Sequence, residues 1–165
     1  MPHACMCQAS GVIGNQLFIA GGCGSGATRA YRLQIYDTSA RTWRLGAPPP
    51  LSFVSTCGVV LDGKFYVFCA PMPGCDGCML VYDPQSDTWT EKTVPWPSDG
   101  LNGRVKTACA HNGRIIVFLN IEESFFGDTA HALASDGSWS SYEFAHTLNS
   151  EKFPDTYALG SVIIG

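Results

Sequence analysis

Two cysteines separated by two residues, Cys75 and Cys78, form the pattern in this sequence that most directly suggests chemistry. A structural zinc site needs four ligands, which usually come from two such pairs. The sequence has no second pair of this spacing, and Cys5 and Cys7, with one residue between them, are a poor substitute. Thioredoxin-type redox chemistry needs the pair at the start of a helix, whereas a strand-like apolar run follows Cys78. We therefore expect Cys75 and Cys78 to be reduced thiols in an exposed loop, with zinc binding or reversible oxidation as the alternative.

A second group of potential metal ligands lies at Glu123, Asp128 and His131. Carboxylate and imidazole ligands together suit divalent iron. The remaining histidines are scattered, and no Gly-x-Ser-x-Gly element or similar nucleophile motif supports acyl transfer. The sequence thus offers one weak candidate metal group and no recognisable catalytic motif.

The composition indicates a single globular domain without a nucleic-acid or membrane partner. Of the 165 residues, 45% are apolar and 15% are charged, and the net charge of −4 comes without any cluster of Lys or Arg. No apolar run is long enough to span a bilayer, and the N-terminus lacks the features of a secretory signal. We therefore expect a cytoplasmic protein, with the nucleus as the alternative, in which most of the 8 cysteines are reduced.

Three sequence marks recur about every fifty residues. A short turn followed by an apolar run comes first, then Tyr-Asp, then Trp. The turns and runs are Gly14–Gly22, Asp62–Ala70 and Asn112–Asn120, the dipeptides are Tyr36-Asp37 and Tyr82-Asp83, and the tryptophans are Trp43, Trp89 and Trp139. Marks that recur in one order indicate a repeat architecture.

Each repeat is predicted to form four antiparallel strands. In the second repeat these are 55–61, 64–69, a strand ending near Tyr82, and 88–91. The Asp62-Gly63 dipeptide favours a tight hairpin, because both residues tolerate positive φ. The run Phe65–Cys69 is apolar on both faces, so the sheet must be covered on both sides. Four-stranded sheets with this period and two buried faces describe the blades of a β-propeller.

The order Gly21-Gly22, Tyr36-Asp37 and Trp43 in the first unit resembles the kelch repeat. The second unit keeps Tyr-Asp and Trp but has Cys69-Ala70 in place of the glycines. The third keeps Trp139 and has Ala132-Leu133 where Tyr-Asp is expected. We expect one all-β domain over residues 1–165, a partial kelch-type propeller with units at about 7–53, 54–104 and 105–155 and a further strand within 156–165.

The resemblance implies that the repeat marks are structural and that function lies in the loops. Gly21 and Gly22 would permit unusual backbone conformations, the aspartates would cap turns, and the tryptophans would pack the blades. The loops after the second strand and between blades resemble a partner-binding face in kelch propellers. Candidate binding residues in these loops are Arg29, Asp76, Trp96, Asp99, Arg104, Glu122, Glu123, Phe125 and Phe126.

The resemblance also bears on function and on the completeness of the ring. Kelch propellers often receive substrates for ubiquitin ligases, so we expect a non-catalytic, cofactor-free module that binds proteins. The alternative is an iron-dependent specifier protein, whose Glu-x-x-x-Asp-x-x-x-His triad is matched except that Asp128 lies one position late. The kelch-fold copper-radical oxidases need a Tyr/His/Cys copper site that cannot be assembled here. Three blades do not close a ring, so we expect a fragment of a longer protein and self-association of the isolated chain.

Overall fold

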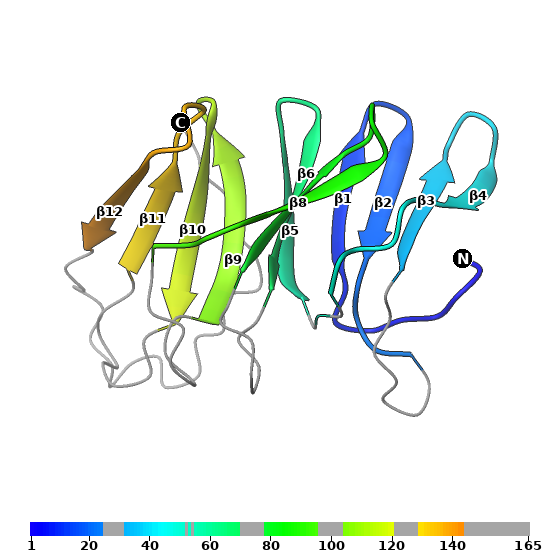
Figure 1. The fold of residues 1–165 in the computed structure, drawn as a ribbon, viewed down its shortest axis with the longest axis horizontal. Helices are drawn as coiled ribbons and strands as arrows, with labels where there is room; N and C mark the ends of the chain where they lie inside the picture. Colours follow the sequence, from blue (N-terminus) through cyan, green and yellow to red (C-terminus); the bar gives the residue numbers. More distant parts are fainter. Residues whose placement is uncertain are drawn as a thin grey trace, which may run out of the picture.

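The computed structural model of the protein describes residues 1–24, 32–51, 53, 55–69, 78–95, 104–120 and 129–143. This part of the chain forms twelve strands and no helix (Figure 1), which confirms the all-β prediction. The strands are β1 Ala9–Ile13, β2 Gln16–Ala20, β3 Leu33–Asp37, β4 Thr42–Leu45, β5 Ser55–Leu61, β6 Lys64–Cys69, β7 Met79–Asp83, β8 Thr88–Lys92, β9 Arg104–His111, β10 Arg114–Asn120, β11 Thr129–Leu133 and β12 Trp139–Glu143.

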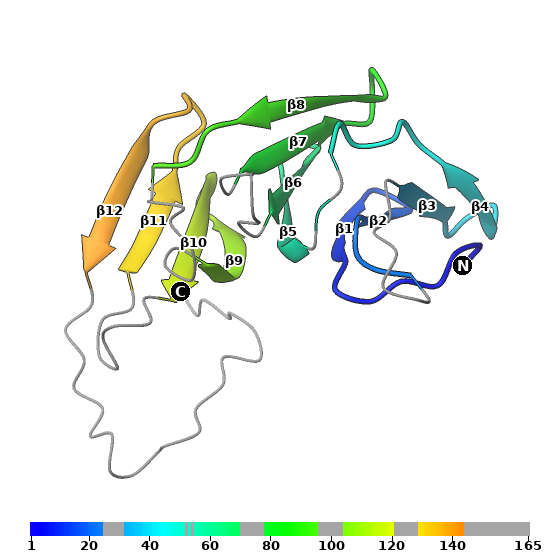
Figure 2. The same ribbon diagram turned by 60° about the horizontal axis from the view of Figure 1, so that its bottom comes forward.

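The strands make three separate four-stranded antiparallel sheets, in which each strand pairs with its neighbour in sequence. We call these blade 1 (β1–β4), blade 2 (β5–β8) and blade 3 (β9–β12). The blades stand side by side in an arc (Figure 1), with β1 next to β5 and β5 next to β9. The first strands therefore line the inside of the arc, and β4, β8 and β12 lie at its rim (Figure 2).

The tight turns adopt the backbone conformations that their sequences predict. Asp62 and Gly63 have φ of 50° and 70°, and Asn112 and Gly113 have φ of 47° and 68°. Positive φ at both central residues is the signature of a type I′ hairpin turn. In the first turn Gly14 alone has positive φ, at 55°, in keeping with its weaker sequence signal.

The aspartates of the repeated Tyr-Asp pair cap the turns that follow them. The Asp37 carboxylate accepts hydrogen bonds from the backbone N–H groups of Ser39 (2.9 Å) and Ala40 (2.8 Å). The Asp83 carboxylate accepts one from the N–H of Gln85 at 2.9 Å. These backbone donors hold the pKa of both carboxyl groups below the usual range. The predicted capping role is confirmed.

Blade 2 buries both of its faces, one against each neighbouring blade. Phe65, Val67 and Leu80 contribute to the core shared with blade 1, whereas Phe68 and Met79 contribute to the core shared with blade 3. Alternate residues along β6 and β7 therefore serve two different cores. The doubly apolar run in β6, which predicted a covered sheet, is explained by this arrangement.

Gly21 and Gly22 follow β2 at a point where the backbone is closely packed against neighbouring residues. Their φ angles are 70° and 87°, values that other residues seldom adopt. A Cβ at Gly21 would lie 2.2 Å from the Phe53 ring, and one at Gly22 would lie 2.5 Å from the Met6 carbonyl oxygen. The glycine pair is therefore needed for both its conformation and its lack of a side chain.

The N-terminal segment pairs with the face of blade 1 that is turned away from blade 2. The side-chain amide of Gln34, which is 3% exposed, donates to the His3 carbonyl and accepts from the His3 N–H, each at 2.9 Å. Met6 and Cys23 exchange two backbone hydrogen bonds of 2.9 Å. A buried polar side chain in the middle of β3 is thereby satisfied by backbone groups.

Candidate functional site

Most residues that the sequence predicted for partner binding lie outside the described part of the chain. These are Arg29, Asp76, Trp96, Asp99, Glu122, Glu123, Phe125 and Phe126, together with the candidate ligands Cys75 and Asp128. Arg104 begins β9, but its side chain is not described. The partner-binding face thus stays a prediction, and the geometry that can be read lies in the blades and their junctions.

Cys78 is not the exposed loop thiol that the sequence predicted. It is 6% exposed and belongs to the core between blades 1 and 2. Its carbonyl accepts a backbone hydrogen bond of 2.9 Å from Cys69, which lies opposite it at the end of β6. A hydrogen bond from the Cys69 side chain lowers the pKa of the Cys78 thiol. The expectation was wrong because Cys78, one residue before β7, already pairs with β6 and packs in the core.

His131 lies within β11 and is 8% exposed. Its Nδ1 is 2.9 Å from the Ser141 hydroxyl on the neighbouring strand β12. Burial lowers the pKa of His131, which favours the neutral imidazole. Among the described residues, no group of three His, Cys, Asp or Glu side chains is placed to hold a metal ion.

At junction 1, between blades 1 and 2, the linker that follows β4 is held by what we call the clasp. The Asp87 carboxylate accepts hydrogen bonds from the Tyr82 hydroxyl (2.6 Å) and the Ala47 N–H (2.8 Å). The Trp89 indole donates to the Ala47 carbonyl at 2.9 Å. Asp87 and Trp89 thus bind the two backbone groups of a single linker residue, and Tyr82 holds the Asp87 carboxylate.

The electrostatics of the clasp favour a neutral tyrosine beside an ionised aspartate. Burial, followed by the hydrogen bond to Asp87, raises the pKa of Tyr82 to about 12. The Ala47 N–H, followed by the Tyr82 hydroxyl, lowers the pKa of Asp87. The Tyr82–Asp87 hydrogen bond contributes to both shifts, and it is strong because its acceptor is charged.

Four aromatic rings pack together at the clasp. The Phe18 ring lies 6.1 Å from Phe65 and 5.8 Å from Tyr82, measured between ring centroids. Tyr82 in turn stacks against Trp89 at 5.0 Å. These separations are within the range of favourable aromatic pairs, so rings from both blades close junction 1.

Strand register identifies the residues of junction 2, between blades 2 and 3, that stand in the clasp positions. Tyr82 pairs with Trp89 across β7 and β8, and Leu133 pairs with Trp139 across β11 and β12. Leu133 therefore replaces Tyr82. The Tyr82–Trp89 separation is seven positions, but Leu133 and Trp139 are six apart. The turn in blade 3 is thus one residue shorter.

The aspartate in that shorter turn is engaged locally. Asp136 accepts hydrogen bonds from the N–H (2.9 Å) and the hydroxyl (2.7 Å) of Ser138. At the other side of the junction, Lys92 ends β8 three residues after Trp89, where Gly46 follows Trp43 at the same distance. Junction 2 therefore has a leucine in place of the clasp tyrosine and a lysine in place of Gly46, keeps a tryptophan at Trp139, and uses its turn aspartate within the turn.

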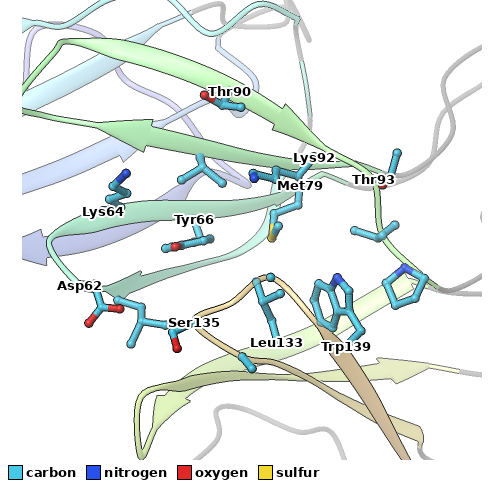
Figure 3. Close-up of a pocket in the computed structure, with 16 residues that line it drawn as sticks. Asp62, Lys64, Tyr66, Met79, Thr90, Lys92, Thr93, Leu133, Ser135 and Trp139 are labelled. Carbon is cyan, nitrogen blue, oxygen red and sulfur yellow. The ribbon is translucent and has the colours of Figure 1, made fainter.

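Junction 2 contains a groove, which we call the rim groove (Figure 3). Its volume is about 530 Å³. Blade 2 forms one wall and the β11–β12 hairpin with the 93–95 linker forms the other. The lining residues are Leu61, Asp62, Lys64, Tyr66, Met79, Val81, Thr90, Lys92, Thr93, Val94, Pro95, Leu133, Ala134, Ser135, Gly137 and Trp139.

The rim groove combines an apolar floor with charged edges. Tyr66, Met79 and Leu133 face one another from the two walls (Figure 3). Lys64 forms an ion pair with Asp83 (3.3 Å), whereas Lys92 has no ion pair within the described residues. Burial raises the pKa of Tyr66, so its phenol is neutral at physiological pH.

Sequence reasoning missed the rim groove because it aligned the third repeat at a fixed offset. That offset placed Ala132-Leu133 at the Tyr-Asp positions, but the strand register places Leu133-Ala134 there. The available signal was the shorter interval before Trp139, which implies a deletion in the turn.

Three blades stacked through their first strands make a partial β-propeller, and comparisons with known proteins agree. The chain superimposes on the solved structure of YjhT with a TM-score of 0.64 and 13% identity, covering 84% of this chain and 52% of that one.

Among the described residues, no helix has the length and apolar character needed to cross a membrane.

The sequence comparisons place a known repeat motif in the first unit. Residues 4–50 match the kelch motif. Over 94 residues the chain is 29% identical to a putative F-box/kelch-repeat protein of Arabidopsis thaliana, a match that covers 53% of this chain and 23% of the relative. The first unit thus carries a kelch motif, and the chain is a partial β-propeller that is similar to a kelch-repeat protein. It spans less than a quarter of that relative and about half of the solved structure.

Proposed function

We propose that this chain is a non-catalytic protein-interaction module, the substrate-receiving part of a ubiquitin-ligase adaptor. The observation that carries the proposal is the kelch motif at residues 4–50 within a stack of blades. The similarity to an F-box/kelch-repeat protein supports the adaptor role. Rigid blades that carry loops of varied sequence suit the recognition of another protein.

A non-catalytic role is consistent with the chemistry of the described residues. His131 is buried and hydrogen-bonded within its own sheet, and Cys78 is part of the core. Each buried side-chain nitrogen or oxygen in the described part of the chain has a hydrogen-bond partner. Unsatisfied buried polar side chains, which often mark catalytic centres, do not occur among the described residues.

The experiment is affinity capture with the tagged full chain after chemical crosslinking in cells. The variant Trp96→Ala, in the loop predicted to face partners, should lose captured proteins that wild type retains. Val12→Ser is the matched control, because Val12 is 59% exposed on blade 1 and should not alter capture. Equal capture by wild type and Trp96→Ala would contradict the predicted binding face.

The adaptor role has its own test in the coding sequence that flanks this segment. An upstream F-box and further kelch units would support it, and a catalytic domain in their place would contradict it. Cytoplasmic location, the absence of nucleic-acid partners and self-association stay predictions. Light scattering of the purified chain checks the last one, because a strict monomer at high concentration would exclude it.

A further inference from the structure

Junctions 1 and 2 are built by the same repeat, yet one is closed and the other is open. In junction 1, Phe18 faces Phe65 and Tyr82. In junction 2, register places Tyr66 in the position of Phe18, because each pairs with the third residue of the following strand. Tyr66 therefore meets aliphatic residues where Phe18 meets two rings.

Two aromatic residues of junction 1 have aliphatic counterparts in junction 2. Leu133 stands in place of Tyr82, and Ile115, which pairs with Leu133, stands in place of Phe65. An aromatic ring that entered between Tyr66, Met79 and Leu133 would restore the contacts found in junction 1. Tyr66 offers a ring for stacking and Met79 a polarizable sulfur, both of which favour an aromatic ligand.

The charges at the edge of the groove indicate which charged group a ligand would carry beside its aromatic ring. Lys64 and Lys92 line it with one carboxylate, Asp62, in a chain of net charge −4. Since Lys64 is already paired with Asp83, the Lys92 ammonium is the group available to an incoming carboxylate. Threonine hydroxyls at Thr90 and Thr93 add hydrogen-bonding groups along the same wall.

We propose that the rim groove is a docking site for an extended acidic peptide segment of a partner protein, which inserts an aromatic side chain against Tyr66, Met79 and Leu133 and places a carboxylate on Lys92. This inference rests on the proposed interaction function and gives it a second surface. The site lies between the β5–β6 and β11–β12 turns (Figure 3), whereas the predicted loop face uses the loops that follow the second strands.

The test is a phage-displayed library of random nine-residue peptides selected on the immobilised full chain. The selected consensus is then synthesised with a fluorescein label and titrated by fluorescence anisotropy. We expect an aromatic residue within two positions of Asp or Glu. Binding should weaken at least about tenfold in Lys92→Glu, because a carboxylate would then meet a carboxylate. It should weaken comparably in Leu133→Tyr, which fills the groove with the side chain found in junction 1.

Val12→Ser is the control that should bind like wild type, and thermal melting verifies the fold of each variant. If Leu133→Tyr melts early, the comparison of Lys92→Glu with wild type decides alone. Absence of an enriched peptide, a consensus without the aromatic-acidic pair, or unchanged affinity in Lys92→Glu would each overturn the proposal. Loop-dependent capture of partners could still succeed in that case, so failure of the groove and failure of the proposed function are distinguishable.

Discussion

Removing the Tyr82 hydroxyl tests how much the clasp contributes to the stability of this stack of blades. Tyr82 is fully buried, and its hydroxyl donates a hydrogen bond of 2.6 Å to the Asp87 carboxylate. A hydrogen bond to a charged group contributes about 1.5–3 kcal/mol to folding. Asp87 is exposed and keeps its hydrogen bond from Ala47. Water can therefore hydrogen-bond to the Asp87 carboxylate in place of the tyrosine hydroxyl, which offsets part of the lost stability. We expect Tyr82→Phe to lower the free energy of unfolding by about 1–2 kcal/mol.

The assay is urea unfolding followed by tryptophan fluorescence, with the slope of free energy against urea required to stay constant. Tyr36→Phe is the matched control. Tyr36 occupies the same repeat position in blade 1 and stacks on Trp43 at 4.9 Å, but its hydroxyl makes no hydrogen bond within the described residues. An equal loss in both variants, or no loss in Tyr82→Phe, would refute the reasoning.

Alkaline pH gives an independent check of the same bond. The folded state raises the pKa of Tyr82 from 10.0 to about 12, mainly by burial, while Arg44 acts in the opposite direction. A raised pKa on an acid means that its neutral form stabilises the fold. That contribution is complete below pH 10 and is lost as the pH rises through about 12. The stability gap between wild type and Tyr82→Phe should therefore narrow from pH 10 to pH 12, and a constant gap would exclude the assigned shift.

Three other predictions concern the glycine pair, the core thiols and the N-terminal segment. Gly21→Ala should destabilise the fold by about 2 kcal/mol or more, through positive φ and overpacking, whereas Gly14→Ala, with open space around it, should cost about 1 kcal/mol in the same urea assay. Cys78 should react with a maleimide far more slowly than the exposed Cys7, as mass spectrometry of labelled peptides would show, because burial outweighs its lowered pKa; equal rates would contradict its place in the core. Gln34→Leu should expose the segment around residue 3 to faster amide hydrogen exchange and cost about 1–2 kcal/mol, and unchanged exchange would show that the side-chain bonds do not hold that segment.

The fold could be predicted from the sequence because its signals are local and repeated. The hairpin turns at Asp62-Gly63 and Asn112-Gly113, the capping aspartates and the doubly apolar strands each have one physical meaning wherever they occur. Agreement among them gave the strand bounds of blade 2 almost to the residue. The kelch motif at residues 4–50 and the three four-stranded sheets therefore agree with the predicted fold.

The candidate site was less predictable, because it depends on what a repeat position has lost. The substitution of Leu133 for Tyr82 reads as an ordinary apolar residue until the register shows which ring it replaces. Cys78 was misplaced for a related reason, since the end of a loop is set by tertiary packing and not by its composition. The residues expected to bind partners lie in loops, where strand periodicity gives no information on side-chain positions.

A double-mutant cycle at junction 1 would show whether the clasp excludes a side chain such as the one Lys92 provides in junction 2. A Cβ at Gly46 would lie 2.8 Å from Leu33, 3.0 Å from Ile35 and 3.2 Å from the Tyr82 hydroxyl. Gly46→Ala should therefore destabilise the wild type by about 1–3 kcal/mol through overpacking.

A Tyr82→Leu background places the blade 3 residue at this position, so one of those close neighbours of Gly46 is absent. The cost of Gly46→Ala should then be smaller, with a coupling of about 0.5–1 kcal/mol between the two positions. The pair Val12→Ser and Tyr82→Leu, on well-separated residues, should be additive in the same urea experiments. Additivity at Gly46 and Tyr82 would mean that the two positions affect stability independently, so that a leucine at the tyrosine position does not by itself make room for a side chain at the glycine position. Coupling would mean that loss of the tyrosine is what makes room for a charged side chain at the rim.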